Sequence, residues 1–130
     1  MSNQRRTGLK NLYRQEFLRS RAWHARRDRW FRHHTRAGLV ACAACGIPDT
    51  ADHLELHHRD YAGVGIVHGV WQAWEDDADL IAMHPYCHEL LHRLIDRDII
   101  LARHRTRRQA SDHALAALQS RLPQLQEEAS

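Results

Sequence analysis

Two pairs of metal-binding residues with the same spacing constrain this chain more than any other feature of its sequence. Two residues separate Cys42 from Cys45, and two residues separate His84 from Cys87. Four nitrogen and sulfur ligands arranged as two such pairs are typical of a closed, tetrahedral structural Zn²⁺ site. The alternative, in which the cysteines are only small buried apolar side chains, leaves the repeated spacing unexplained. We therefore predict one structural zinc ion, whose binding would contribute directly to folding.

The cysteine count and the absence of long apolar stretches indicate the compartment. The chain has three cysteines, which cannot all pair in disulfides. In an intracellular chain, the two-residue spacing favours metal over a disulfide. No apolar segment of the kind found in secretion signals follows the opening residues 1–6. We expect a soluble, cytoplasmic protein without membrane contact.

Twelve histidines are the most unusual number in the composition, and four of them form a second group. His88 and His92 lie four residues apart on a predicted helix, so they project from one face and can bind the same ion. His57 and His58 end a predicted strand, where neighbouring side chains point to opposite sides. Only one of them can readily join the helical pair, and the other must have a different role. A surface histidine cluster without such a role is the alternative.

Hydrophobic periodicity predicts two helices at the start of the chain, in an α+β fold. The first covers residues 9–17, and the second runs from an N-cap at Ser20 to about His34. Aromatic residues share one side of the second helix, and we assign them to the core. Residues 39–41 and 53–57 have the pattern of strands, which we expect to pair as a hairpin.

The second half of the chain begins with a long connection over residues 59–79. Its Trp71 and Trp74 are spaced for one turn of helix packed on the core. Helices are then predicted over residues 85–101 and over residues 111–122, the second capped by Ser111.

Charge is distributed unevenly along the chain. Residues 1–36 hold eleven Lys and Arg and two acidic residues, a balance of +9; residues 37–98 hold three and eleven, a balance of −8; residues 99–130 hold five and three, a balance of +2. A basic segment suits contact with phosphates, because neutralising them releases condensed counterions. The alternative is a solvated, Arg-rich helix. The candidate phosphate contacts of this segment are Arg26, Arg27 and Arg29.

Several separated motifs, in this order, resemble the ββα-metal motif of HNH endonucleases. They are Leu-Glu-Leu-His-His-Arg-Asp-Tyr at 54–61, Asp-Leu-Ile-Ala-Met at 79–83 and His-Pro-Tyr-Cys-His-Glu-Leu-Leu-His at 84–92. Residues 17–23 and 42–46 resemble the N-terminal part of small phage and bacterial members that carry zinc, and the whole likeness covers residues 17–95. Together with the charge balance, the predicted helices and the chain length, it predicts a basic helical arm over 1–36, an HNH core over 37–102 and a C-terminal helical extension over 103–130, within one compact domain.

The resemblance also implies roles for the histidines. The first histidine of the family's pair is a metal ligand and the second is the general base, which makes His57 a ligand and His58 the base. His88 matches the next ligand, and His92 matches the last ligand of members with three histidines. The family's central Asn, which braces the loop, falls at Asp79, where a carboxylate accepts hydrogen bonds but cannot donate them. Two further departures are His84, where zinc-bearing members usually have Cys, and the longer connection over 59–78.

These roles imply a metal-dependent endonuclease that hydrolyses phosphodiester bonds of nucleic acid, with DNA as the expected substrate. Three imidazoles favour Zn²⁺, Ni²⁺, Co²⁺ or Mn²⁺ over Mg²⁺ at the catalytic site. Arg59 is a further candidate contact to the nucleic-acid backbone. Family members act beside phage packaging motors or in mobile elements, so proteins of those systems are candidate partners. The alternatives are a non-cleaving nucleic-acid-binding or adaptor module stabilised by zinc, and a protein-interaction module that docks through Trp71 and Trp74.

Overall fold

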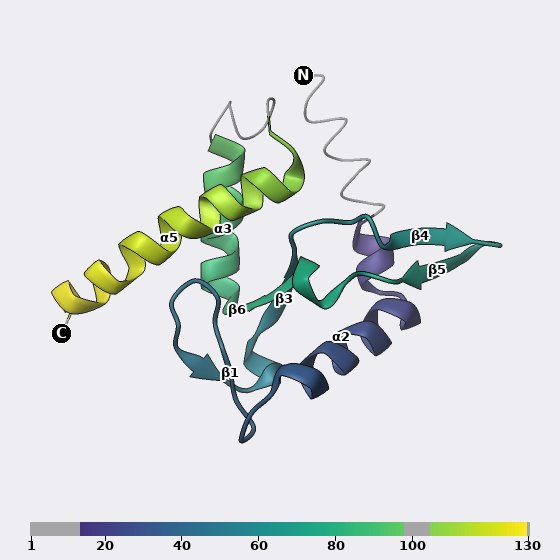
Figure 1. The fold of residues 1–130 in the computed structure, drawn as a ribbon, viewed down its shortest axis with the longest axis horizontal. Coiled ribbons are helices and arrows are strands. Elements are labelled where there is room, and N and C mark those ends of the chain that lie inside the picture. Colours follow the sequence, from purple (N-terminus) through teal and green to yellow (C-terminus); the bar gives the residue numbers. More distant parts are fainter. Residues whose placement is uncertain (1–13, 98–104, 130) are drawn as a thin grey trace.

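The computed structural model describes residues 14–97 and 105–129, and it confirms a mixed α+β fold. Three two-stranded antiparallel sheets, β1–β2, β3–β6 and β4–β5, lie among three labelled helices (Figure 1). A further helical segment covers residues 14–18. The elements are α2 (Arg21–His34), β1 (Val40–Ala41), β2 (Pro48–Asp49), the 3-10 helix η1 (Ala51–His53), β3 (Glu55–His58), β4 (Val64–Val67), β5 (Val70–Ala73), the 3-10 helix η2 (Asp77–Asp79), β6 (Leu80–Met83), α3 (Pro85–Arg97) and α5 (Arg107–Ala129).

Helix α2 begins at the predicted N-cap. The Ser20 hydroxyl accepts a hydrogen bond from the Trp23 amide at 3.2 Å, which satisfies one of the free N–H groups of the first turn. Trp23, Trp30 and Phe31 are buried, so the assignment of the aromatic side to the core is confirmed. After His34 the chain turns away through residues with positive φ, among them Gly38 at 79°.

The predicted hairpin between residues 39–41 and 53–57 is wrong. Strand β1 pairs with β2, because the turn at Cys42–Cys45 reverses the chain and Gly46, with φ at 78°, permits that reversal. Strand β3 pairs instead with β6, so that Leu56 lies opposite Ala82 and His58 opposite Leu80. The core gathers on this pair and includes Leu54, Leu56, Leu80, Ala82, Met83 and Leu91.

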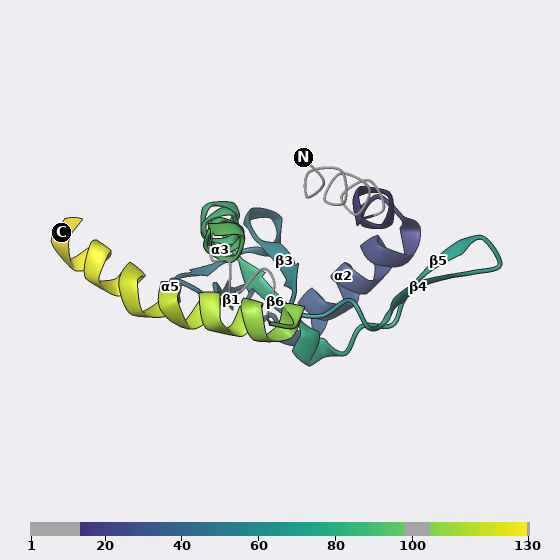
Figure 2. The ribbon, with the colours of Figure 1, turned by 90° about the horizontal axis from the view of Figure 1, so that it is seen from above.

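The connection over residues 59–79 contains a β-hairpin rather than a helical turn. His68 and Gly69 both have positive φ, as a two-residue turn between β4 and β5 requires. Trp71 therefore lies on β5, and Trp74 follows the strand with most of its side chain exposed. The hairpin extends away from the rest of the molecule beyond α2 (Figure 2).

The last two helices frame the cleft described below. Helix α3 begins at Pro85 as predicted, while its predicted continuation over residues 98–101 lies outside the described residues. Helix α5 begins earlier than predicted. Thr106 and Gln109 form a reciprocal capping box, with side chain to backbone distances of 3.1 Å in both directions. Ser111 is therefore buried inside the helix and is not its cap, and the helix passes the predicted end at residue 122.

Helix α5 packs on α3 and contributes buried residues to the core, so the C-terminal segment is an integral part of the fold. Within the described ranges 14–97 and 105–129, we find no helix with the length and apolar character needed to cross a membrane.

Candidate metal centres and catalytic cleft

Cys42, Cys45, His84 and Cys87 lie together, with one ligand atom of each within 4.8 Å of the others. The two pairs come from different elements: the turn after β1 supplies the first, and the junction of β6 with α3 supplies the second. All three cysteines are free thiols, and Cys42 and Cys87 are buried. The donor set, three sulfurs and one imidazole nitrogen, is compatible with a structural zinc site.

The surroundings of this cluster also fit a cation. The Nδ1 atom of His84 lies 3.4 Å from Cys45 Sγ, while its Nε2 atom lies 3.1 Å from Asp49 Oδ2. A carboxylate on the second nitrogen is the usual way of orienting a ligand histidine. Burial raises the pKa of the Cys42 thiol, but backbone N–H groups, including that of His84, outweigh burial and lower it to about 7. Burial and the two neighbouring thiols raise the pKa of Cys87 to about 12, and a bound cation would relieve this repulsion.

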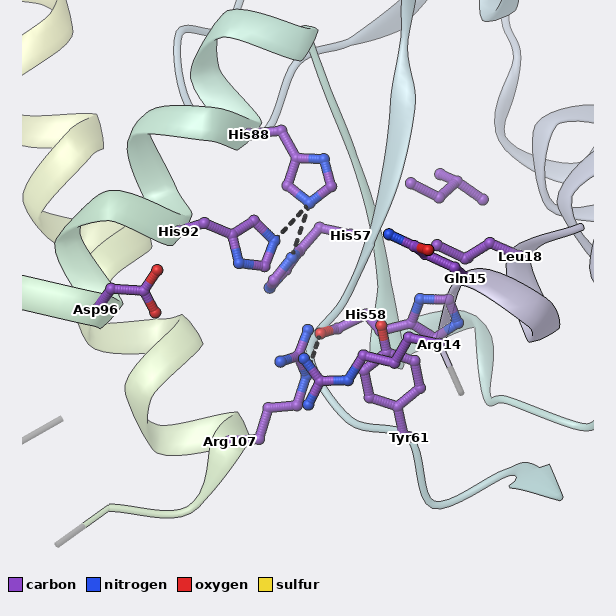
Figure 3. A pocket seen from close by; sticks show the side chains of 11 residues that line it. Arg14, Gln15, Leu18, His57, His58, Tyr61, His88, His92, Asp96 and Arg107 are labelled. Atoms are coloured by element: carbon purple, nitrogen blue, oxygen red, sulfur yellow. Dashed lines mark hydrogen bonds between the residues drawn. The ribbon is translucent and has the colours of Figure 1, made fainter. Parts of the chain in front are cut away.

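A second cluster joins β3 to α3. His57 Nδ1 lies 3.2 Å from His88 Nε2, which lies 3.0 Å from His92 Nε2 (Figure 3). One nitrogen of each ring lies within 4.8 Å of the others, so the three could hold one metal ion. The i, i+4 spacing on α3 brings the two helical rings to the same face, as the sequence predicted. Three imidazoles suit a transition-metal ion better than Mg²⁺.

Burial keeps these three imidazoles neutral. It is the largest cause that lowers the pKa of His57 to about 2 and those of His88 and His92 to about 4, and the Arg107 charge lowers each further. Neutral rings at pH 7 have free nitrogen lone pairs. The second nitrogen of His57 lies 3.0 Å from Ser111 Oγ, and that of His88 lies 3.6 Å from a Glu55 carboxylate oxygen. Both contacts resemble the outer contacts that orient metal ligands.

His58 has different neighbours from His57, as expected for adjacent residues on a strand. Its Nε2 atom lies 2.7 Å from Glu75 Oε2, and both side chains are buried. Its ring stacks on that of Tyr61, with centroids 4.4 Å apart. Because a carboxylate accepts, Nε2 carries the proton and Nδ1 retains its lone pair. Burial lowers the pKa of His58, although the Glu75 hydrogen bond opposes that shift.

A cleft of about 360 Å³ opens over both groups of histidines. Its walls come from the helical segment over 14–18, from β3 and the loop after it, from α3 and from the start of α5. The residues that line it are Arg14, Gln15, Leu18, Leu56, His57, His58, Tyr61, His88, His92, Asp96 and Arg107 (Figure 3).

Helix α5 holds the loop that follows β3. Arg108 forms an ion pair with the buried Asp79, and Asp79 in turn accepts a hydrogen bond at its backbone oxygen from the Arg59 amide at 2.7 Å. Arg59 also forms a two-point ion pair with Asp112, at 2.8 and 2.9 Å. Asp79 therefore braces this loop through an arginine partner, which suits a carboxylate where an amide was expected.

Sequence reasoning missed several residues that line the cleft or hold its lining residues in place. Nothing in the pattern around Glu75 distinguishes it from other residues of the long connection. The basic stretch over residues 103–108 was a signal for Arg107 and Arg108, although it did not indicate where they would fold. Ser111 was noticed only as a helix cap.

The four arginines proposed as nucleic-acid contacts differ in their surroundings. Arg26 is buried, and its guanidinium bonds to the Glu75 backbone oxygen and to Asp77. This corrects the expectation that Arg26 lies on the solvated side of α2, and we leave it out of any interface. Arg27 donates to the backbone oxygens of residues 51 and 54, and Arg59 is engaged as described above. Arg29 is exposed.

Comparison with known proteins adds no family to this geometry. No protein-family model matches the chain, and neither a curated protein nor a solved structure gives a match. The residues of the cleft therefore carry the information on function.

Proposed function

We propose that the chain is a metal-dependent endonuclease of the HNH type that hydrolyses phosphodiester bonds of nucleic acid, with DNA as the substrate. One observation carries the proposal: His57, His88 and His92 converge on one point, while His58 lines the same cleft without joining them. The order of β3, β6 and α3, two antiparallel strands followed by a helix, supports the same proposal.

His58 acts as the general base. Its Nδ1 lone pair takes a proton from a water molecule, whose oxygen forms a new bond to phosphorus as the bond to the leaving sugar oxygen breaks. The leaving oxygen takes up a proton from solvent. The Glu75 carboxylate holds the opposite ring nitrogen, so that the base keeps one tautomer and one orientation.

His57, His88 and His92 would hold the catalytic metal ion. When bound, such an ion supplies Lewis-acid stabilisation of the charge that develops on the phosphate and on the leaving oxygen. Ser111 and Glu55 orient two of the three rings for that purpose. A module that binds nucleic acid without cutting needs only the cluster of three cysteines and His84, so the oriented histidines favour the nuclease over the adaptor.

A plasmid-nicking assay with added Mn²⁺, Ni²⁺ or Mg²⁺ tests the proposal. We expect His58→Ala to lower the nicking rate by about 10²-fold or more, the usual loss for a general base. The affinity of the three-histidine cluster for metal should stay nearly unchanged. His88→Ala should instead weaken metal binding at the histidine cluster, as measured by calorimetric titration of the zinc-loaded protein with Mn²⁺ or Ni²⁺. His113→Ala is the matched control, because His113 is exposed on α5. Nicking by His58→Ala at the parent rate would refute His58 as the general base, and a parent that nicks with none of the three metals would refute the nuclease assignment.

A further inference from the structure

Two guanidinium groups from distant parts of the sequence converge on one aromatic ring in the cleft. The Cζ atom of Arg14 lies 5.0 Å from the Tyr61 ring centroid, and that of Arg107 lies 4.6 Å from it. Tyr61 also stacks on His58. Figure 3 shows both arginine side chains reaching toward this ring, beside the three clustered histidines.

Arg14 and Arg107 stand apart from the other arginines near the cleft in their charge partners among the described residues. No carboxylate among residues 14–97 and 105–129 forms an ion pair with either of them, whereas Arg26, Arg59 and Arg108 each have an acidic partner. Burial lowers the pKa of Arg107, and the nearby charge of Arg14 contributes in the same direction, whereas Tyr61 and Asp60 oppose the shift. Holding two cations together at a partly buried position costs free energy unless an anion joins them.

The orientation of Arg107 leaves its donors available for such an anion. Its Nε atom donates to the His58 backbone oxygen at 3.0 Å, and among the described residues its two terminal nitrogens have no hydrogen-bond partner. The planar guanidinium group can donate two parallel hydrogen bonds to the oxygens of a phosphate group. The face of the Tyr61 ring attracts both cations through cation–π contacts. Asp96 is the acidic residue among those that line the cleft.

We propose that Arg14, Tyr61 and Arg107 form a binding subsite for a backbone phosphodiester of the nucleic acid, next to the phosphate that is cut. The nucleic-acid identity of the ligand rests on the proposed function, but binding of a phosphodiester does not require cleavage. The anchoring of Arg107 on the backbone of His58 places this subsite beside the general base.

The test is a titration of the ¹⁵N-labelled, zinc-loaded full chain with a thymidine dinucleotide, which carries one phosphodiester and no phosphomonoester. No other divalent metal is added, so that the dinucleotide stays intact. We expect saturable shifts of the Arg107 Nε–H signal and of the Tyr61 ring. Arg107→Gln and Arg14→Gln should each weaken binding roughly tenfold, since a hydrogen bond to a charged group contributes about that much. Arg105→Gln, which removes an exposed charge two residues before Arg107, should bind like the parent.

Binding at the parent affinity by both Arg107→Gln and Arg14→Gln would overturn the subsite, as would shifts given by inorganic phosphate alone and not by the dinucleotide. Using variants on two separate elements keeps the test decisive if one of them folds poorly. The second measurement is the affinity for a DNA duplex, without added metal, at several salt concentrations. Each variant should reduce the slope of log affinity against log salt concentration by about one. If the parent binds the dinucleotide but cuts no plasmid, the nuclease proposal is refuted and the subsite proposal is not affected.

Discussion

Each of the two adjacent histidines at the end of β3 has a neighbouring side chain at one of its ring nitrogens. Ser111 lies against Nε2 of His57, and Glu75 lies against Nε2 of His58. Since a neutral imidazole has one donor and one acceptor nitrogen, the acceptor-only Glu75 carboxylate fixes the tautomer of His58, with the proton on Nε2. His57 and His58 therefore contact different elements, as the proposed division between metal ligand and base requires.

At this scale the lowered pKa values predict how stability changes with pH. Burial lowers the pKa of His88 from 6.5 to about 4, so at pH 5 the folded chain keeps this ring neutral while the unfolded chain protonates it. Because the unfolded state binds more protons, the free energy of unfolding falls as the pH falls from about 6.5 to about 4. When the pH is lowered from 7 to 5, we expect the free energy of unfolding of the parent to fall by about 2 kcal/mol more than that of His88→Gln.

Urea unfolding of both proteins at the two pH values, without a second metal, measures this difference. Protonation of the zinc cluster affects both proteins alike, so the difference reports on the imidazole. Equal losses in parent and variant would contradict the lowered pKa.

Among the elements, α5 contacts several of the segments that form the cleft. From its first two turns come Arg107, Arg108, Ser111 and Asp112, which contact β3, the loop after it and η2. A capping box at Thr106 and Gln109 fixes where this helix begins. The start of α5 thus decides which side chains reach the histidines.

The Arg108–Asp79 ion pair gives a test of that arrangement. Asp79 is buried, so removing its cation leaves an unpaired buried carboxylate. We expect Arg108→Gln to lower the free energy of unfolding by about 1–3 kcal/mol, less than for a fully buried pair because Arg108 is 41% exposed. Adding Asp79→Asn should recover part of that loss, which a double-mutant cycle in urea measures.

The control is Arg93→Gln, whose ion pair with Glu89 is exposed on α3. Exposed ion pairs contribute about 0–1 kcal/mol to the free energy of unfolding, so this variant should be about as stable as the parent. A loss as large as that of Arg108→Gln would mean that α5 is not specially tied to Asp79.

Over the whole molecule, the cluster of three cysteines and His84 joins parts that otherwise share few strand contacts. The β1–β2 turn meets the end of β6 and the first turn of α3 at this cluster, and each of the three sheets has only two strands. Zinc binding in small domains contributes about 10–16 kcal/mol, comparable with the whole stability of a typical domain. Folding of this chain should therefore depend on the metal.

We expect elemental analysis to find one zinc ion per chain, and Cys45→Ala to lose it together with amide protection over β1–β2 and the start of α3. Hydrogen exchange measures the protection. Ile47→Ala, a truncation of an exposed side chain near the same turn, should retain both zinc and protection. Unchanged folding of the parent in a strong chelator would contradict a structural zinc.

Features that depend on a few neighbouring residues could be predicted from the sequence. The ligand spacing of Cys42 and Cys45, the N-cap at Ser20, the start of α3 at Pro85 and the helical pairing of His88 with His92 all follow from local geometry. The HNH resemblance and the roles it implies for His57 and His58 remain a proposal based on such local motifs.

Only the tertiary structure decided which distant segments meet. The pairing of β3 with β6, the burial of Arg26 against Asp77, and the arrival of Glu75 and Arg107 at His58 join residues far apart in the sequence. Such contacts depend on how the whole chain buries its apolar surface and on where its turns direct each strand, and no local pattern encodes them. The sequence by itself therefore determined the candidate ligands, while the packing of α5 and of the β4–β5 connection decided what surrounds them.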